Sequence, residues 1–199
     1  RLCVKGFADS QGQQVNTYSP TADLLSQRML IHIAVTMHWH LVSLDISLAF
    51  LQGMTFVEAE QRQRKEANDT GRATMEILHR EAYVEPPPDI WPLLEKLGKC
   101  TWECKDVHRL VWQLLKGGFG LKDAPLLFRK DLDFTLVNAD IDGMKAQKSL
   151  MDKCFYSWFG AGEKLQGCVP THVDDEGATG AERFLLALAN TLENRYGKL

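Results

Sequence analysis

The sequence predicts an α+β fold, in which strands and helices are mixed along one chain. Three observations support this prediction. Short apolar runs typical of strands alternate with longer segments whose apolar residues recur every three or four positions, as they do in amphipathic helices. No predicted strand is followed by the Gly-rich loop of a dinucleotide-binding fold. Two strand-like runs, residues 41–44 and 165–173, lead directly to acidic residues, Asp45 in one case and Asp174 and Asp175 in the other.

The bulk composition is that of a globular domain. The chain has 199 residues, of which 45% are hydrophobic and 25% charged, so we expect a single domain over residues 1–199. A net charge of -3 argues against a surface that coats nucleic acid. Five cysteines at irregular spacing argue against a disulfide framework. No run approaches the roughly 20 apolar residues of a membrane span, so we expect an intracellular protein without a membrane partner. Because the chain starts at Arg1 rather than Met, we expect it to be a piece of a longer protein.

The first half of the chain begins with a predicted short strand over residues 1–7. A helix follows, with Ser19 as N-cap and Pro20 in its first turn. Its apolar face is expected to comprise Leu25, Met29, Leu30, Ile33, Ala34 and Met37. The strand over residues 41–44 comes next. Residues 54–81 are then dense in charge, and we interpret them as an exposed, helical or mobile insertion with a solvated charged face.

The second half begins with a short strand over residues 82–85, which the prolines at 86–88 end. A helix over residues 90–97 and a strand over 109–115 are expected next. Asp123 is a natural N-cap for a helix whose apolar face comprises Leu127, Phe128, Leu132 and Leu136. Strands over 154–159 and 165–173 follow, and Thr179 with Glu182 predicts a capping box for the last helix.

The acidic residues at the strand ends predict a metal centre. Adjacent carboxylates repel each other unless a cation lies between them, and Mg²⁺ prefers oxygen ligands. Asp45, Asp174 and Asp175 would together offer three carboxylates from two strand ends. Such a set suits a pair of Mg²⁺ ions, or Mn²⁺ in their place, that catalyses in-line phosphoryl transfer.

Four motifs in a fixed order carry a family resemblance. They are DISLAFLQG at residues 45–53, YVEPP at 83–87, GLKDAP at 120–125 and HVDD at 172–175. Together they resemble the reverse transcriptase of copia-type LTR retrotransposons over nearly the whole chain. The resemblance implies an RNA-directed DNA polymerase with a right-hand architecture. An antiparallel, ferredoxin-like palm sheet backed by helices is expected, with partial fingers and no thumb.

The resemblance also implies roles for individual residues. Asp45 and Asp174 would ligate both metal ions, Asp175 would assist them, and the carbonyl of Ile46 would complete one coordination shell. Phe50 would lie beneath the sugar and exclude a ribose 2'-hydroxyl. The residues expected to contact the triphosphate, the incoming nucleotide or the template are Arg1, Lys5, Phe119, Gly120 and Lys122. The implied partners are an RNA or DNA template with its primer, deoxynucleoside triphosphates and the other domains of a retrotransposon polyprotein, inside cytoplasmic particles.

Two other interpretations stay open. The chain departs from the family pattern at several positions, among them His172, where the family usually has Tyr, and Asp123, where it usually has Gln. A carboxylate near a triphosphate is repulsive, so a catalytically decayed palm remnant that binds nucleic acid or protein is the alternative. Cys100, Cys104 and His108 have the spacing of zinc ligands on one helical face. They form the basis of a third hypothesis, a zinc-stabilised interaction module.

Overall fold

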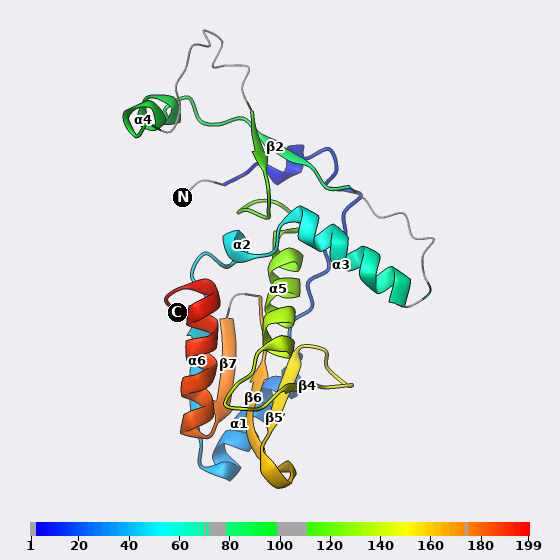
Figure 1. Ribbon diagram of the computed structural model, residues 1–199, viewed down its shortest axis with the longest axis vertical. Coiled ribbons are helices and arrows are strands. Elements are labelled where there is room, and N and C mark those ends of the chain that lie inside the picture. The colour runs from blue at the N-terminus through cyan, green and yellow to red at the C-terminus, as the bar shows by residue number, and fades with distance from the viewer. Residues whose placement is uncertain (1–2, 70, 72–78, 99–110, 174) are drawn as a thin grey trace.

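A five-stranded antiparallel sheet forms the body of the molecule (Figure 1). The computed structural model describes residues 3–69, 71, 79–98, 111–173 and 175–199. Across the sheet the strands are β1 (His40–Asp45), β7 (Asp175–Gly180), β6 (Leu165–Pro170), β5 (Phe155–Phe159) and β4 (Ala146–Lys148). A separate two-stranded sheet pairs β2 (Ala82–Val84) with β3 (Trp112–Leu114). The α+β class and the antiparallel sheet with helices are confirmed.

Helices pack on both faces of the main sheet. The main core lies between one face and two helices, α5 (Ala124–Asn138) and α6 (Glu182–Tyr196), and it contains the fully buried Trp158. The other face is covered by α1 (Leu24–Met37), whose Leu30 packs in a smaller cluster with Phe155 and Cys168. Burial raises the pKa of the Cys168 thiol to about 11. The sheet is therefore the middle layer of three.

Small residues let α6 approach the sheet closely. A Cβ added at Gly167 of β6 would lie 2.1 Å from the ring of Phe184, and one at Gly180 of β7 would lie 2.6 Å from it. Only glycine fits at these two positions, because such separations are far inside van der Waals contact. The Phe184 ring, 5.2 Å from that of Trp158, fills the space that the glycines leave.

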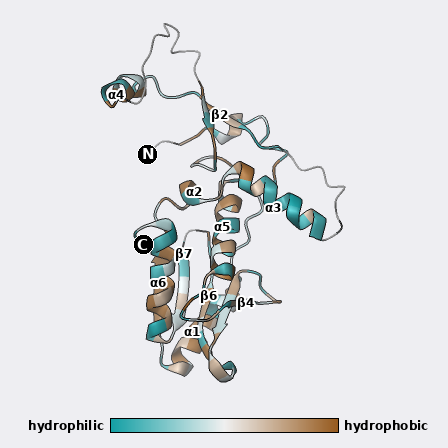
Figure 2. Cartoon of the chain, in the orientation of Figure 1, coloured by the Kyte–Doolittle hydropathy of each residue, from teal (hydrophilic) through white to brown (hydrophobic). Residues whose placement is uncertain are grey.

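A second, smaller core lies beyond the end of the sheet, toward the top of Figure 1. It joins α3 (Phe56–Asp69) to the start of α5 through Phe56 and Leu127, among others. The other elements of this region are α2 (Ala49–Gln52), α4 (Ile90–Lys96) and the 3-10 turn η1 (Gly6–Ala8). In the main sheet, the 3-10 turn η3 (Ala161–Glu163) links β5 to β6. Phe50 packs against both cores. Figure 2 shows α3 hydrophilic over most of its length, in agreement with the charged helix expected there.

Three sequence expectations for the first half of the chain were wrong in detail. Residues 3–5 form no strand, and the 3-10 turn η1 follows them. Helix α1 begins at Leu24 rather than near Ser19, because the side chain of Asp23 caps it by accepting a hydrogen bond from the Ser26 amide at 2.7 Å. Three residues of its expected apolar face are exposed, namely Leu25, Met29 and Met37.

The end of the chain differs from the expected pattern as well. Strand β6 ends at Pro170 instead of continuing to residue 173. Thr179 belongs to β7, where its hydroxyl donates to the His40 carbonyl at 2.9 Å, and Ala181 is the N-cap of α6. The expected capping box is therefore absent. Its place is taken by a strand, β7, that the sequence did not predict.

Candidate active site at the ends of β1 and β7

Two of the three expected acidic residues face each other across neighbouring strands. Asp45 is the last residue of β1 and Asp175 the first of β7, and the antiparallel register pairs them directly. The Cβ atoms of directly opposed residues lie about 4.5–5.5 Å apart. Both residues are exposed, and the described residues supply neither carboxylate with a hydrogen-bond donor or a cation. Asp174 lies outside the described residues. Like charges held in this way destabilise a sheet unless a cation binds between them.

The turn after Asp45 forms a pocket beside this pair. Ile46 is buried and its carbonyl accepts a hydrogen bond from the Ala49 amide at 3.2 Å, which closes the turn. Leu48 adopts φ 56°, in the left-handed region that leucine rarely occupies. The pocket measures about 450 Å³ and is lined by Asp45, Ile46, Ser47, Leu48, Ala49, Phe50 and Phe119. Its volume lies within the range of small-molecule sites.

Two aromatic rings stand together in this pocket. The ring centroids of Phe50 and Phe119 lie 5.7 Å apart at an interplanar angle of 60°, an edge-on arrangement that stabilises aromatic pairs. The Phe119 carbonyl accepts a hydrogen bond from the Val4 amide at 2.7 Å. Gly120 follows with φ 96°, and a Cβ there would lie 1.9 Å from the Val4 oxygen. Glycine is therefore required at 120 by the neighbouring chain segment of this protein.

The expected basic residues are not part of the pocket wall. Lys5 and Lys122 are both exposed, and neither lines the pocket beside Asp45. Arg1 lies outside the described residues, as do Cys100, Cys104 and His108. The site residues that the structure brings together are thus Asp45, Ile46, Phe50, Phe119 and Asp175, whereas the two lysines lie at the surface.

Comparisons with protein-family models, curated proteins and solved structures find no match to this chain. Within the described ranges, no helix is long and apolar enough to cross a membrane.

An ion cluster around the buried Arg80 was not expected from the sequence. Arg80, part of the insertion interpreted as solvated, is 9% exposed. Its Nε donates to Asp123 Oδ2 at 2.8 Å and its Nη1 to Asp9 Oδ1 at 3.1 Å. Burial alone would lower the pKa of Arg80, but the hydrogen bonds to Asp123 and Asp9 raise it overall. Asp123 holds the N-cap position of α5 without donating or accepting a capping bond.

The ion cluster changes the electrostatics expected around Asp123. The Asp123 carboxylate, which would repel a triphosphate if it were unpaired, is paired with Arg80. Arg80 also pairs with Asp9, so the three side chains together carry one net negative charge. No local sequence pattern could have identified this pairing, because Asp9, Arg80 and Asp123 are far apart in the chain. They meet only when the segments around β2 and α5 pack together.

The donor set at the strand ends fits a magnesium ion. Carboxylate and carbonyl oxygens are the ligands that Mg²⁺ prefers, and it usually retains several waters besides. Asp45 and Asp175 offer two exposed carboxylates, and the Ile46 carbonyl lies in the adjoining turn. Among the described residues no group of three or more His, Cys, Asp or Glu side chains is placed to hold a metal. The third carboxylate of the expected set, Asp174, lies outside that range.

Proposed function

We propose that this chain is an RNA-directed DNA polymerase domain that extends a primer with deoxynucleoside triphosphates. The observation that carries the proposal is the direct pairing of Asp175 with Asp45, which itself lines a pocket of about 450 Å³. The two carboxylates belong to two of the four motifs that resemble copia-type reverse transcriptases. Their opposition in the sheet supports the assignment, because a two-metal site needs acidic residues from separate strands within a few ångströms.

In the proposed reaction the residues of this chain bind and orient the substrates. Asp45, Asp174 and Asp175 would hold two magnesium ions, with the Ile46 carbonyl as a further ligand. When bound, these ions lower the pKa of the primer 3'-hydroxyl and neutralise charge on the triphosphate. Phe50 and Phe119 would form an apolar wall for the sugar and base. A ring at position 50 collides with a 2'-hydroxyl, so deoxynucleotides would be selected.

Two readouts test this proposal. Electron paramagnetic resonance with Mn²⁺ measures metal binding, and primer extension with Mg²⁺ measures catalysis. We expect two bound Mn²⁺ ions, and we expect both signals to be lost in Asp45→Asn and in Asp174→Asn. Asp69→Asn, an exposed residue at the end of α3, is the matched control and should leave both unchanged. Extension that survives both active-site substitutions would overturn the proposal.

A further inference from the structure

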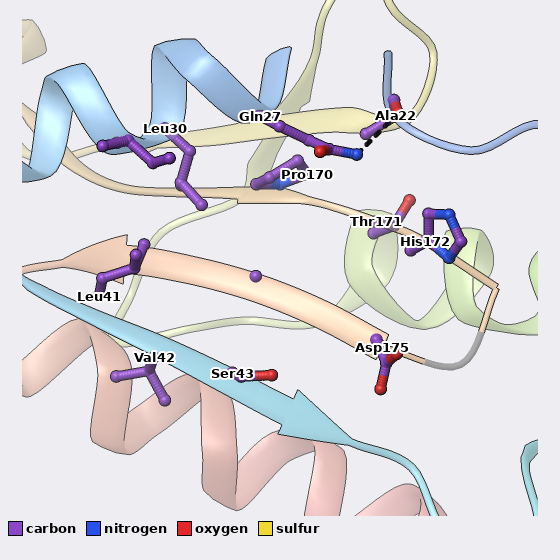
Figure 3. A pocket seen from close by; sticks show the side chains of 12 residues that line it. Ala22, Gln27, Leu30, Leu41, Val42, Ser43, Pro170, Thr171, His172 and Asp175 are labelled. Atoms are coloured by element: carbon purple, nitrogen blue, oxygen red, sulfur yellow. Dashed lines mark hydrogen bonds between the residues drawn. The ribbon is translucent and has the colours of Figure 1, made fainter. Parts of the chain in front are cut away.

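A second pocket, lined in part by Asp175, lies between α1 and the sheet (Figure 3). It measures about 380 Å³. It exists because the sheet carries small residues beneath the helix: Ser43 of β1 and Gly177 of β7 are ladder partners on the face toward α1. A Cβ added at Gly177 would already lie 3.1 Å from Leu30 Cδ2. The missing side chain at position 177 thus leaves the space open.

The two ends of this pocket differ in chemistry. Figure 3 shows Leu30 and Leu41 at one end and His172 and Asp175 at the other. Ile31 adds to the apolar wall, and it remains half-exposed although it is a large hydrophobic side chain. An occupant that covered Leu41 and Ile31 would remove apolar surface from water, at about 25 cal/mol per Å². The pocket therefore favours a ligand with an apolar body and one polar end.

The charge at the polar end determines what that end can be. Asp175 is exposed, and no described residue donates a hydrogen bond or offers a cation to its carboxylate. Asp45, its direct neighbour across the ladder, adds a second negative charge. An anionic ligand would be repelled, and a neutral one would leave the carboxylates uncompensated. A protonated amine compensates them.

We propose that the pocket binds an organic amine, with the apolar body between α1 and the sheet and the ammonium group at Asp175. This inference goes beyond the polymerase proposal and does not depend on it, because it concerns a different cavity and requires no metal. The two proposals share Asp175, so a metal ion and an ammonium group would compete for its carboxylate. The volume, the apolar wall and the unpaired carboxylate are independent observations that agree on one class of ligand.

Three probes of similar shape and different charge test the assignment. Tryptamine carries an ammonium group, 3-ethylindole is its neutral counterpart and indole-3-acetate is anionic. We expect tryptamine to bind with a dissociation constant of roughly 0.1–1 mM in a ligand-observed NMR titration. The neutral probe should bind about five-fold more weakly and the anion more weakly still, as for one partly screened ion pair. Equal affinity for the three probes, or no binding of tryptamine, would refute the proposal.

Two substitutions locate the binding. Asp175→Asn preserves volume and should weaken tryptamine about five-fold while leaving 3-ethylindole unchanged. Ser43→Leu places a large side chain in the pocket and should abolish binding of both probes. Asp69→Asn, which is distant on α3, is the control for charge and should have no effect. Because Asp175→Asn is isosteric, its result stands even if Ser43→Leu proves unstable. Tryptamine affinity unchanged in Asp175→Asn would place the amine elsewhere and overturn the assignment.

Discussion

Asp45 and Asp175 face each other across two neighbouring strands, and this pairing has an energetic consequence at the scale of single residues. In the metal-free protein the two carboxylates repel each other. Asp45→Asn should therefore raise the free energy of unfolding by about 0.5 kcal/mol, the usual size of a cross-strand charge effect. Urea denaturation of both proteins without divalent ions measures this difference in the free energy of unfolding.

Magnesium should make the wild-type protein more stable than the Asp45→Asn variant, which is the reverse of the order expected without metal. At ten times its dissociation constant, Mg²⁺ should stabilise the wild type by about 1.4 kcal/mol, because it binds the folded state alone. The Asp45→Asn variant should gain little. A wild-type protein whose unfolding is indifferent to Mg²⁺ at every concentration would contradict the proposed metal site.

Phe50 is the residue whose side chain can be tested for substrate selection. It lines the pocket beside Asp45 and contacts Phe119 edge-on. Phe50→Ala should lower the preference for deoxynucleotides over ribonucleotides by about ten-fold or more, because the ring that excludes the 2'-hydroxyl is removed. Competitive primer extension with both nucleotide types measures the ratio. Phe50→Tyr keeps the ring and is the control, and an unchanged ratio in the alanine variant would exclude Phe50 from this role.

At the scale of elements, Arg80 ties the segment before β2 to the start of α5. Replacing it with methionine would remove the cation from the buried Asp123 and the partly buried Asp9. Arg80→Met should therefore lower the free energy of unfolding by roughly 3–5 kcal/mol. Arg64→Met breaks only the pair with Glu60 within α3, in which the Arg64 side chain is largely exposed, and should lower the free energy of unfolding far less. Chemical denaturation measures both values. If the two substitutions lower the free energy of unfolding by similar amounts, the Arg80 cluster does not stabilise the fold.

Asp152 anchors α1 to the loop between β4 and β5. Its carboxylate accepts hydrogen bonds from the Ser26 hydroxyl and from the amides of Asp23 and Cys154. Burial alone would raise the pKa of Asp152, but these hydrogen bonds lower it below its ordinary value of 3.8. A depressed pKa means that the stabilisation is present above about pH 4 and is lost as pH falls through the lower, folded-state value.

The corresponding substitution should show this pH dependence. Asp152→Ala should cost about 2 kcal/mol at pH 7, because hydrogen bonds to a charged acceptor are lost. The difference in the free energy of unfolding between this variant and the wild type should become smaller below pH 4. Thermal unfolding across pH 2–7 measures it, with Asp69→Ala as the control. A difference that stayed constant with pH would show that the ionised carboxylate is not what holds the helix.

Several elements could be predicted from local sequence, and the reasons for the misses are physical. The apolar periodicity of α5 and α6 identified both helices, and β1 and β5 follow their apolar runs. Strand β7 was missed because its sequence, DEGATG, has little intrinsic strand propensity. Its glycines are selected by packing, since larger residues there would collide with Phe184 or with Leu30. Tertiary contacts override propensity in such a strand.

The candidate site was predictable only in part for a similar reason. The local pattern of a strand that ends at an acidic residue correctly placed Asp45 at the end of β1. The same pattern selected Asp175, but the structure places it at the start of β7. The Arg80 cluster and the pocket above Gly177 depend on segments that are distant in sequence, and no local pattern identifies them. The expected roles of Lys5 and Lys122 came from the family resemblance alone, and the described structure leaves both side chains at the surface.

At the scale of the whole molecule, two cores of unequal size meet at Phe50. The larger core contains fully buried residues of the central strands, such as Tyr156 and Val169. The two-stranded sheet of β2 and β3 has one buried residue, Ala82, and its other residues are partly buried or, like Tyr83, exposed. Amides of β5 and β6 should therefore exchange with solvent deuterium at least about 100-fold more slowly than those of β2. Hydrogen-exchange mass spectrometry measures these rates, and equal exchange rates for β2 and for β5 and β6 would contradict the expected difference in stability between the two sheets.

The register of β1 with β7 has a consequence for synthesis of the protein. His40 pairs with Gly180, so β1 leaves the ribosome long before its partner exists. At roughly 5–20 residues per second, translation of the intervening chain takes on the order of ten seconds. Throughout that interval the apolar sides of α1 and β1 have no sheet to cover them, and the nascent chain is open to aggregation. The two opposed acidic residues come together only after the whole stretch from Asp45 to Asp175 has been made.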